Sequence, residues 1–250
     1  MTASITAIIP VRNRSGVRVE NCLRSLRWQQ TVNAFDIVVS DLGSTGPHRQ
    51  SIAELAQRYN ARLVYSPYDG LWNRSLALNI GIRASNTDYV FCTDADMLFK
   101  PNFLESALAV QEELGGEAMV LCRCHDLPPY VPEKLWEVAD YPMLERGSHI
   151  RKTSGVGACQ VARKSFFEDT HGYDEKYVFW GSEDVDMTAR AEQYGLQLTW
   201  MSDRTSMLHQ WHRTLKRDMP LQYHINKLRF RLTKRVVVKN HGGWGQCAPS

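Results

Sequence analysis

Two aspartates separated by one residue, Asp94 and Asp96, follow a short apolar segment. That segment, Tyr89–Thr93, is rich in aromatic and β-branched residues, and this pattern predicts a buried strand that ends in an acidic edge. In an extended backbone both carboxylates point the same way, and they repel each other unless a cation or hydrogen-bond donors neutralise them. A divalent metal ion would do so. The motif alone is equally typical of an ordinary strand-to-loop exit.

Glu183, Asp184 and Asp186 form a second acidic cluster, next to Trp180 and Gly181. The first turn of a surface helix would accommodate three acids, but it would require neither the tryptophan nor the glycine. In a cleft, Trp180 could stack on the apolar face of a sugar. The carboxylates could then bind hydroxyls and remove a proton, which a weakly acidic sugar hydroxyl needs.

The overall composition is that of an ordinary globular protein. A chain of 250 residues fits one large domain, with 43% hydrophobic and 23% charged residues, and no segment reaches the roughly 18 apolar residues of a membrane span. The N-terminus leads directly into a strand-like segment at 5–10, so we expect no signal peptide. Six scattered cysteines form no paired framework, which favours reduced thiols and a cytoplasmic location. The net charge of +3 says little about partners, and we expect no nucleic-acid partner.

Basic residues crowd the last part of the chain, where Asp218 is the only acid after Asp203. They are Arg204, Arg213, Lys216, Arg217, Lys227, Arg229, Arg231, Lys234, Arg235 and Lys239. Such a region suits a substrate phosphate, an acidic polymer or an anionic membrane, which would place the protein at the inner face of the membrane. A solvated basic face explains the pattern equally well.

Strand-like and helix-like segments alternate in the first half of the chain. Strand patterns at 5–11, 35–40, 63–65 and 89–93 are separated by helical patterns at 19–28, 52–59 and 71–84. This alternation predicts an α/β fold with a mostly parallel central sheet flanked by helices. Ligands of such sheets bind beyond the carboxyl ends of the strands. We therefore expect residues 10–14, 41–44 and 94–96 to meet at one edge and form a crevice large enough for a nucleotide.

The second half is less regular. We expect a helix at 101–114, a strand at 118–122, a strand at 157–161 and a helix at 184–194. The polar loop at 146–155 is a candidate lid over a substrate, or a plain surface loop. No linker divides the chain, so the sequence predicts a single domain over residues 1–250.

Six short motifs stand in a fixed order over roughly residues 5–212. They are Pro10-Val11-Arg12-Asn13-Arg14, Asn73-Arg74-Ser75-Leu76-Ala77-Leu78-Asn79-Ile80-Gly81, Asp94-Ala95-Asp96, Ser154-Gly155-Val156-Gly157-Ala158, His171-Gly172-Tyr173 and Trp180-Gly181-Ser182-Glu183-Asp184. Together they resemble the motifs of glycosyltransferases with the GT-A fold, a Rossmann-like nucleotide-binding fold. The resemblance is strongest to the β-1,4-galactosyltransferase type and to bacterial family 2 enzymes such as the chondroitin polymerases. Six motifs in the same order make coincidence improbable where one would be weak.

The resemblance implies a metal-dependent, inverting glycosyltransferase that moves a sugar from a nucleotide-sugar, with a UDP-sugar as the expected donor, to a hydroxyl. The acceptor would be a glycan, a lipid-linked molecule or a small molecule. By the same resemblance Asp184 is the catalytic base, Glu183 binds substrate hydroxyls, Asp96 binds the metal and Asp94 binds the ribose or donor sugar. The substrate-binding and nucleotide-binding residues would be Pro10, Arg12, Arg14, Asp41, Asn73, Arg74, Asn79, Asp94, Trp180 and Gly181.

A histidine after the last core strand normally completes the metal site of this family. His209 fits that position better than the alternative, His212. Carboxylate, imidazole and diphosphate ligands suit Mn²⁺ or Mg²⁺ better than zinc. Asp41 would meet the base, although Leu42 replaces the second Asp of the family's D-D-G-S pattern. Arg12 and Arg14, together with Lys216 and Arg217, are expected to add positive charge near the phosphates.

The resemblance divides the expected domain into a nucleotide-sugar-binding half at 1–100, an acceptor and catalytic half at 101–212 and a basic extension at 213–250. Two alternatives stay open: a retaining transferase of the same fold, and a module that binds sugar nucleotides without turnover. The acid at position 184 favours inversion, because an inverting transfer needs a general base. A phosphotransferase with Asp94 as nucleophile is disfavoured because Leu98 occupies the Thr/Val position of that motif. The sequence identifies neither the acceptor, the donor sugar nor the oligomeric state.

Overall fold

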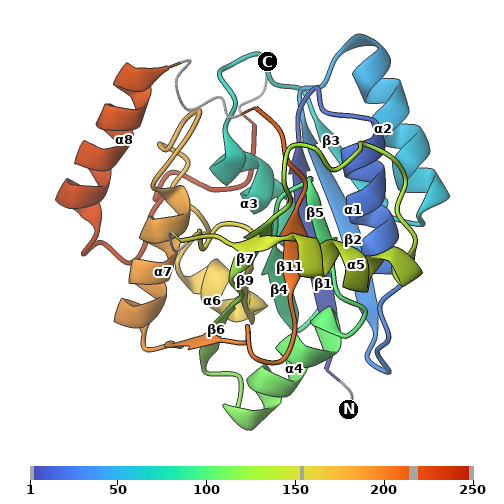
Figure 1. The fold of residues 1–250 in the computed structure, drawn as a ribbon. Helices are drawn as coiled ribbons and strands as arrows, with labels where there is room; N and C mark the ends of the chain where they lie inside the picture. The colour runs from blue at the N-terminus through green and yellow to red at the C-terminus, as the bar shows by residue number, and fades with distance from the viewer. Residues whose placement is uncertain (1–2, 153–154, 214–218, 248–250) are drawn as a thin grey trace.

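A seven-stranded sheet forms the centre of the molecule, as the computed structural model of residues 3–152, 155–213 and 219–247 shows (Figure 1). Its strand order is β10-β6-β9-β4-β1-β2-β3. The strands are β1 (Ile5–Val11), β2 (Phe35–Leu42), β3 (Arg62–Ser66), β4 (Tyr89–Cys92), β6 (Ala118–Leu121), β9 (Gln160–Arg163) and β10 (Gln197–Trp200). Only β9 runs against the others, because it pairs antiparallel with both β4 and β6. The predicted α/β fold with a mostly parallel sheet is therefore confirmed.

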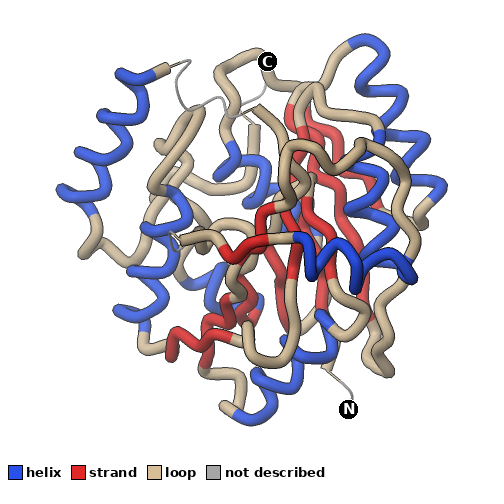
Figure 2. The backbone as a smooth tube through the Cα atoms, in the orientation of Figure 1, coloured by secondary structure: helices blue, strands red, loops and turns tan. Residues whose placement is uncertain are grey.

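Helices cover both faces of this sheet (Figure 2). They are α1 (Val17–Arg27), α2 (Gly46–Arg58), α3 (Arg74–Ala84), α4 (Phe103–Glu113), α5 (Tyr141–Gly147), α6 (Lys164–Asp169), α7 (Glu183–Tyr194) and α8 (Pro220–Thr233), with a 3₁₀ turn, η1 (Val138–Asp140). Alternate residues of β1 face opposite sides: Ile5 and Ile9 pack with α1, α2 and α4, whereas Ile8 packs with α3, α6 and α7. Among the described helices, none has the length and apolar character that a membrane span requires.

A second, smaller sheet was not predicted. It has the order β5-β11-β7-β8 and consists of β5 (Met97–Phe99), β7 (Cys124–Asp126), β8 (His149–Ile150) and β11 (Met207–His209). Its register places His209 directly opposite Asp126. Part of the candidate lid at 146–155 belongs to this sheet as β8, and residues 153–154 lie outside the described residues.

Several boundaries differ from the sequence prediction; the helix expected at 52–59, for example, spans Gly46–Arg58 as α2. The helix expected at 71–84 begins only at Arg74, because the Asn73 side chain caps it by accepting a hydrogen bond from the Leu76 N–H at 2.9 Å. The strand expected at 157–161 begins at Gln160. The shift at α3 leaves Asn73 in the loop before that helix, and the shift at β9 leaves Gly157, Ala158 and Cys159 in the loop before that strand.

The basic C-terminal region is integrated into the domain. The buried Asn226 of α8 donates hydrogen bonds to the carbonyls of Val178 and Trp180 at 2.9 and 3.0 Å. Arg229 donates to Asp174 at 2.8 Å, and Trp244 packs into the core next to α3 and α7. Hydrogen bonds of Asn226 and the contact of Arg229 with Asp174 therefore attach helix α8 to the rest of the domain.

A buried ion pair, Asp186 with Arg190, joins α7 to the segments that precede and follow it. Both side chains are fully buried, and the Arg190 Nε donates to Asp186 Oδ2 at 2.8 Å. Arg190 also donates to the carbonyls of Gly172 and Val237, and the Lys239 Nζ lies 3.6 Å from Asp186 Oδ1. The third acid of the cluster at 183–186 thus stabilises the fold, while its two neighbours lie in the candidate site.

We predict that Asp186→Asn destabilises the protein by about 3–5 kcal/mol, because Arg190 loses its carboxylate partner in a fully buried position. Urea unfolding followed by circular dichroism measures this change. The control is Glu192→Gln on the exposed side of the same helix, which should change the free energy of unfolding by less than about 0.5 kcal/mol. Equal effects of the two substitutions would contradict the structural role of Asp186.

Candidate active site

The loops that follow β1 and β2 meet at the carboxyl edge of the sheet, as the sequence predicted. Strand register pairs Val11 with Asp41. Beyond it, the Asn13 N–H donates to Ser44 Oγ at 2.7 Å and the Thr45 N–H donates to Asn13 Oδ1 at 2.9 Å. These two bonds fix the shape of the edge next to the buried Pro10.

Arg12 and Asp41 play different parts at this edge. The Arg12 guanidinium donates to the carbonyls of Tyr68 and Gly70 and so holds the loop after β3. Asp41 is buried, and its Oδ1 accepts a hydrogen bond from the Ser44 N–H at 3.0 Å. Its Oδ2 has no hydrogen-bond partner among the described residues. A buried carboxylate oxygen without a donor is costly, so Asp41 is suited to accept a hydrogen bond from a ligand.

Asp94 and Asp96 do not lie side by side on an extended strand, so that expectation was wrong. Residues 95–96 form a turn between β4 and β5, which sends the two carboxylates to different partners. Asp94 accepts a hydrogen bond from Arg74 Nε at 2.8 Å, and its side chain is 37% exposed. Asp96, only 8% exposed, contacts Arg14 and His212.

Arg74 connects the two acidic clusters. Its guanidinium donates to Asp94 and, through Nη2, to the Gly157 carbonyl at 2.7 Å. Its Nη1 lies 3.8 Å from Glu183 Oε1 and has no hydrogen-bond partner among the described residues. The side chain is 12% exposed. A single buried cation therefore holds together motifs more than 100 positions apart.

Glu183 and Asp184 begin α7 after a tight turn. Phe179, Gly181 and Ser182 have φ values of 69°, 100° and 77°, which turn the chain sharply so that the first residues of the helix face Arg74. A side chain at Gly157 would place its Cβ 3.0 Å from Asp184 Oδ2, so glycine permits this close approach.

The pKa values of both carboxyl groups are raised. Burial is the largest cause for Glu183, and the negative charge of Asp184 adds to it, so its pKa is about 7 despite the opposing charge of Arg74. Burial likewise raises the pKa of Asp184, against the lowering effect of Arg74. Carboxyl groups with raised pKa values are suited to proton transfer.

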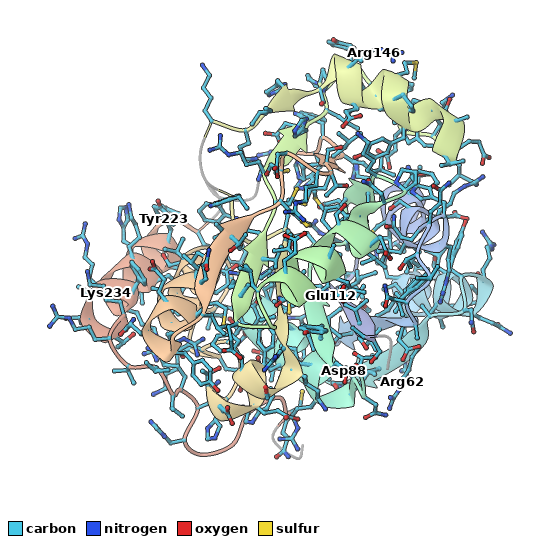
Figure 3. All side chains as sticks on the ribbon, turned by 90° about the horizontal axis from the view of Figure 1, so that it is seen from below. Arg62, Asp88, Glu112, Arg146, Tyr223 and Lys234 are labelled. Atoms are coloured by element: carbon cyan, nitrogen blue, oxygen red, sulfur yellow. The ribbon has the colours of Figure 1, made fainter. Side chains whose placement is uncertain are left out.

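Trp180 lies on the surface next to these acids. Its side chain is 42% exposed, and its ring packs against Tyr223 of α8 with 5.4 Å between ring centroids. A Cβ at Gly181 would lie 3.2 Å from the Tyr223 ring, so a larger residue there would crowd this contact. Figure 3 labels Tyr223 on α8. The Trp180 ring is thus partly exposed to solvent, and the Tyr223 ring packs against it.

Both candidate histidines converge on Asp96. One ligand atom from each of Asp96, His209 and His212 lies within 4.8 Å of the other two. The His212 Nε2 is 2.9 Å from Asp96 Oδ2, the His209 Nε2 is 3.9 Å from Asp96 Oδ1, and the two Nε2 atoms are 3.3 Å apart. Burial would raise the pKa of Asp96, but the hydrogen bond from His212 and the charges of His209 and Arg14 lower it to about 2. One carboxylate and two imidazoles form a donor set that could hold a divalent metal ion.

Asp126 was missed by the sequence reasoning. Its Oδ1 lies 3.0 Å from His209 Nδ1, and its Oδ2 accepts a hydrogen bond from Arg151 Nε at 2.9 Å. Although burial opposes it, the contacts with His209 and Arg151 hold the pKa of Asp126 well below its usual range. A carboxylate at Nδ1 leaves His209 Nε2 directed toward Asp96. No motif contains Asp126, and only the pairing of β7 with β11 could have identified it.

A cavity of about 410 Å³ opens beside this triad, within the usual size range of ligand pockets. Asp96 and His212 line it, together with three arginines, Arg14, Arg18 and Arg213. The positive charge suits an anionic ligand.

The other predicted residues lie in supporting positions or outside the described residues. Asn73 caps α3 and donates to the Glu175 carbonyl at 2.7 Å. Asn79 is fully buried, and its amide bonds the Tyr173 backbone at 2.7 and 2.8 Å. Ser154, Lys216 and Arg217 lie outside the described residues.

Comparison with known proteins identifies the family of this chain. Residues 6–170 match glycosyl transferase family 2, and residues 144–213 match the N-terminal domain of galactosyltransferase. The chain belongs to glycosyl transferase family 2. This confirms the resemblance found in the sequence motifs.

Curated relatives of this family 2 chain are glycosyltransferases and polysaccharide synthases. It is 23% identical to validoxylamine A glucosyltransferase from Streptomyces hygroscopicus subsp. jinggangensis (strain 5008), over 78% of this chain and 53% of the relative. It is 24% identical to chondroitin synthase from Pasteurella multocida (strain Pm70), over 74% of this chain and 22% of the relative. The chain therefore spans about half, or less, of the length of these relatives.

Solved structures with the same fold include two glycosyltransferases. TarS of S. aureus, residues 1–349 in complex with UDP-GlcNAc, has a TM-score of 0.63 at 18% identity, over 86% of this chain and 60% of that chain. GalNAc-T7 with UDP, GalNAc and Mn²⁺ has a TM-score of 0.65 at 14% identity, over 85% of this chain and 44% of that chain. At these identities the likeness shows the GT-A fold alone.

Proposed function

We propose that this chain is a metal-dependent, inverting glycosyltransferase that moves a sugar from a UDP-sugar to a hydroxyl group. The observation that carries the proposal is the convergence of Asp96, His209 and His212 beside an arginine-lined cavity in a family 2 chain. The acceptor would be a glycan, a lipid-linked molecule or a small molecule. The same features would serve a module that only binds sugar nucleotides, and the experiments below separate the two.

Several residues support a nucleotide diphosphate as the ligand. Arg14 and Arg213 line the cavity and would face the diphosphate, while the unpartnered Oδ2 of Asp41 would accept a hydrogen bond from the base. Pro10 and Arg12 would shape the base pocket. The relatives agree with this assignment, since TarS was solved with UDP-GlcNAc and GalNAc-T7 with UDP and Mn²⁺.

Asp96, His209 and His212 would hold the metal, for which Mn²⁺ or Mg²⁺ fits the oxygen and imidazole donors. When bound, the metal supplies positive charge that stabilises the leaving diphosphate. Arg14, which contacts Asp96 at 3.1 Å in the structure, would be free to turn toward the same phosphates. Asp94, held by Arg74, would bind the donor sugar.

Asp184 would act as the general base. It takes the proton of the acceptor hydroxyl, whose oxygen forms a bond to the anomeric carbon, while the bond from that carbon to the diphosphate oxygen breaks and its electron pair leaves with UDP. Attack from the face opposite the diphosphate inverts the anomeric configuration. Glu183 would bind a substrate hydroxyl, and Trp180 would stack on the sugar. A retaining transfer would not need a base at position 184.

We predict that UDP stabilises the protein only in the presence of Mn²⁺. A ligand at about 100 times its Kd adds about 2.7 kcal/mol, which for a chain of this size raises the Tm by roughly 5–10 °C. A thermal-shift series with UDP, GDP and ADP, each with Mn²⁺ and with a chelator, measures this. The absence of a response to every nucleoside diphosphate would refute the proposed donor class.

Asp184→Asn is expected to lower the transfer rate by about 10²-fold or more, because the general base is lost, while UDP binding stays unchanged. UDP release from a panel of UDP-sugars, with a mixture of sugar acceptors, gives the rate. The exposed Asp203→Asn serves as the control and should keep full activity. NMR of the product tests inversion, and full activity of Asp184→Asn would exclude Asp184 as the base.

Asp126→Asn is expected to weaken Mn²⁺ binding by about 10–100-fold, because His209 loses the carboxylate that orients its ring. Calorimetric titration of the nucleotide-free protein with Mn²⁺ measures this without any turnover. Arg151→Gln removes the other partner of Asp126 and should change the affinity far less. Unchanged Mn²⁺ affinity in Asp126→Asn would show that Asp126 does not support the metal site.

A further inference from the structure

Helix α8 exposes a row of large apolar side chains. Leu221, Ile225, Leu228 and Leu232 are 72%, 48%, 55% and 74% exposed. Their spacing of four, three and four residues places them along one face of the helix, and we call this row the α8 stripe. Contiguous apolar side chains on the surface of a protein indicate an interaction surface.

The orientation of α8 is fixed, and it turns the stripe outward. On the opposite side Asn226 is fully buried and bonds the carbonyls of Val178 and Trp180, while Arg229 pairs with the buried Asp174. An amphipathic helix usually buries its apolar face. Here Asn226 and Arg229, together with the Tyr223 ring against Trp180, attach the helix to the domain, and the side chains of the stripe face outward. Figure 1 shows α8 as an outer helix at the edge of the molecule.

Basic side chains lie next to the stripe. Arg231 is exposed on one flank, and Lys227 is exposed further round the helix with its Nζ over the Tyr223 ring. Lys234 and Arg235 are exposed at the C-terminal end of the helix, where Figure 3 labels Lys234. The sequence contains no Asp or Glu from residue 219 to residue 250. Helix α8 and the segment after it therefore carry positive side-chain charges and no negative ones, which favours an anionic partner.

We propose that α8 lies on the surface of an anionic lipid bilayer. The α8 stripe would enter the boundary between head groups and acyl chains, and Lys227, Arg231, Lys234 and Arg235 would contact lipid phosphates. Long basic side chains suit this position because their stems cover apolar surface while their charges reach the head groups. The binding does not depend on the proposed transfer chemistry.

A second copy of the chain fits this surface less well. Two stripes packed together would bring like charges into contact, with no acid on α8 to pair them. The helix also has only 14 residues, or two heptads, whereas a stable coiled coil needs about three or four. The charge pattern thus selects lipid over self-association.

Flotation of the full chain with vesicles, in the absence of nucleotide, tests the proposal. We expect binding to phosphatidylcholine vesicles that contain about 30% phosphatidylglycerol, little binding to pure phosphatidylcholine, and weaker binding at high salt. The double variant Leu228→Gln/Leu232→Gln should lose at least about tenfold in vesicle affinity. Lys227→Gln/Arg231→Gln should lose affinity for the anionic vesicles alone.

The matched control is Val32→Gln/Met143→Gln, which removes two exposed apolar side chains that are 87% and 51% exposed elsewhere on the surface. It should bind vesicles like the wild type, and circular dichroism verifies that all variants fold. Absence of wild-type binding to anionic vesicles would overturn the proposal, as would equal losses in the control. A dimer in sedimentation velocity that disappears in Leu228→Gln/Leu232→Gln would assign the stripe to a second copy instead.

Discussion

The buried guanidinium of Arg74 is the contact on which the candidate site depends. Asp94 comes from the edge of the central sheet and Glu183 from the start of α7, and both carry negative charge into a partly buried space. They stay close together because Arg74 lies between them, and a buried cation is stable only with such partners. Its own position follows from the cap at Asn73, which starts α3 at Arg74. One helix start therefore fixes the geometry of both acidic motifs.

Different cations neutralise Asp96 and Glu183, so a change of charge at one of these acids leaves the partner of the other in place. Asp96 is balanced by His212, His209 and Arg14, and among the described residues none of these three forms a hydrogen bond or ion pair with Arg74. A metal ion could take the place of these cations at Asp96 without removing the charge that holds Glu183. The raised pKa of Glu183 and the lowered pKa of Asp96 record these two environments. The site thus combines an acidic side suited to proton transfer with a cationic side suited to phosphate.

The sequence predicted what depends on local pattern and missed what depends on pairing. Six strands of the central sheet were found because apolar runs such as Ile5–Val11 carry a strong signal, whereas β10 was missed, and the acids were found because they stand in short motifs. The small sheet was missed because strands of two or three residues have no measurable period. Asp126 was missed with it, since its partner His209 is far away in the chain. Likewise, nothing local to Asp94 indicates that Arg74 holds it.

The basic C-terminal region shows why charge counts alone cannot assign a partner. Arg229 and Lys239 belong to the same run of cations as Lys227 and Arg231, but the first two approach the buried Asp174 and are partly or fully covered. Lys239 follows α8, whereas the different environments of Arg229 and Lys227 come from the rotation of α8. Asn226 sets this rotation, because its amide satisfies the carbonyls of the strained turn that carries Trp180. That requirement turns a polar residue inward and the leucines outward, so the turn before Glu183 and the exposed face of α8 have a common physical origin.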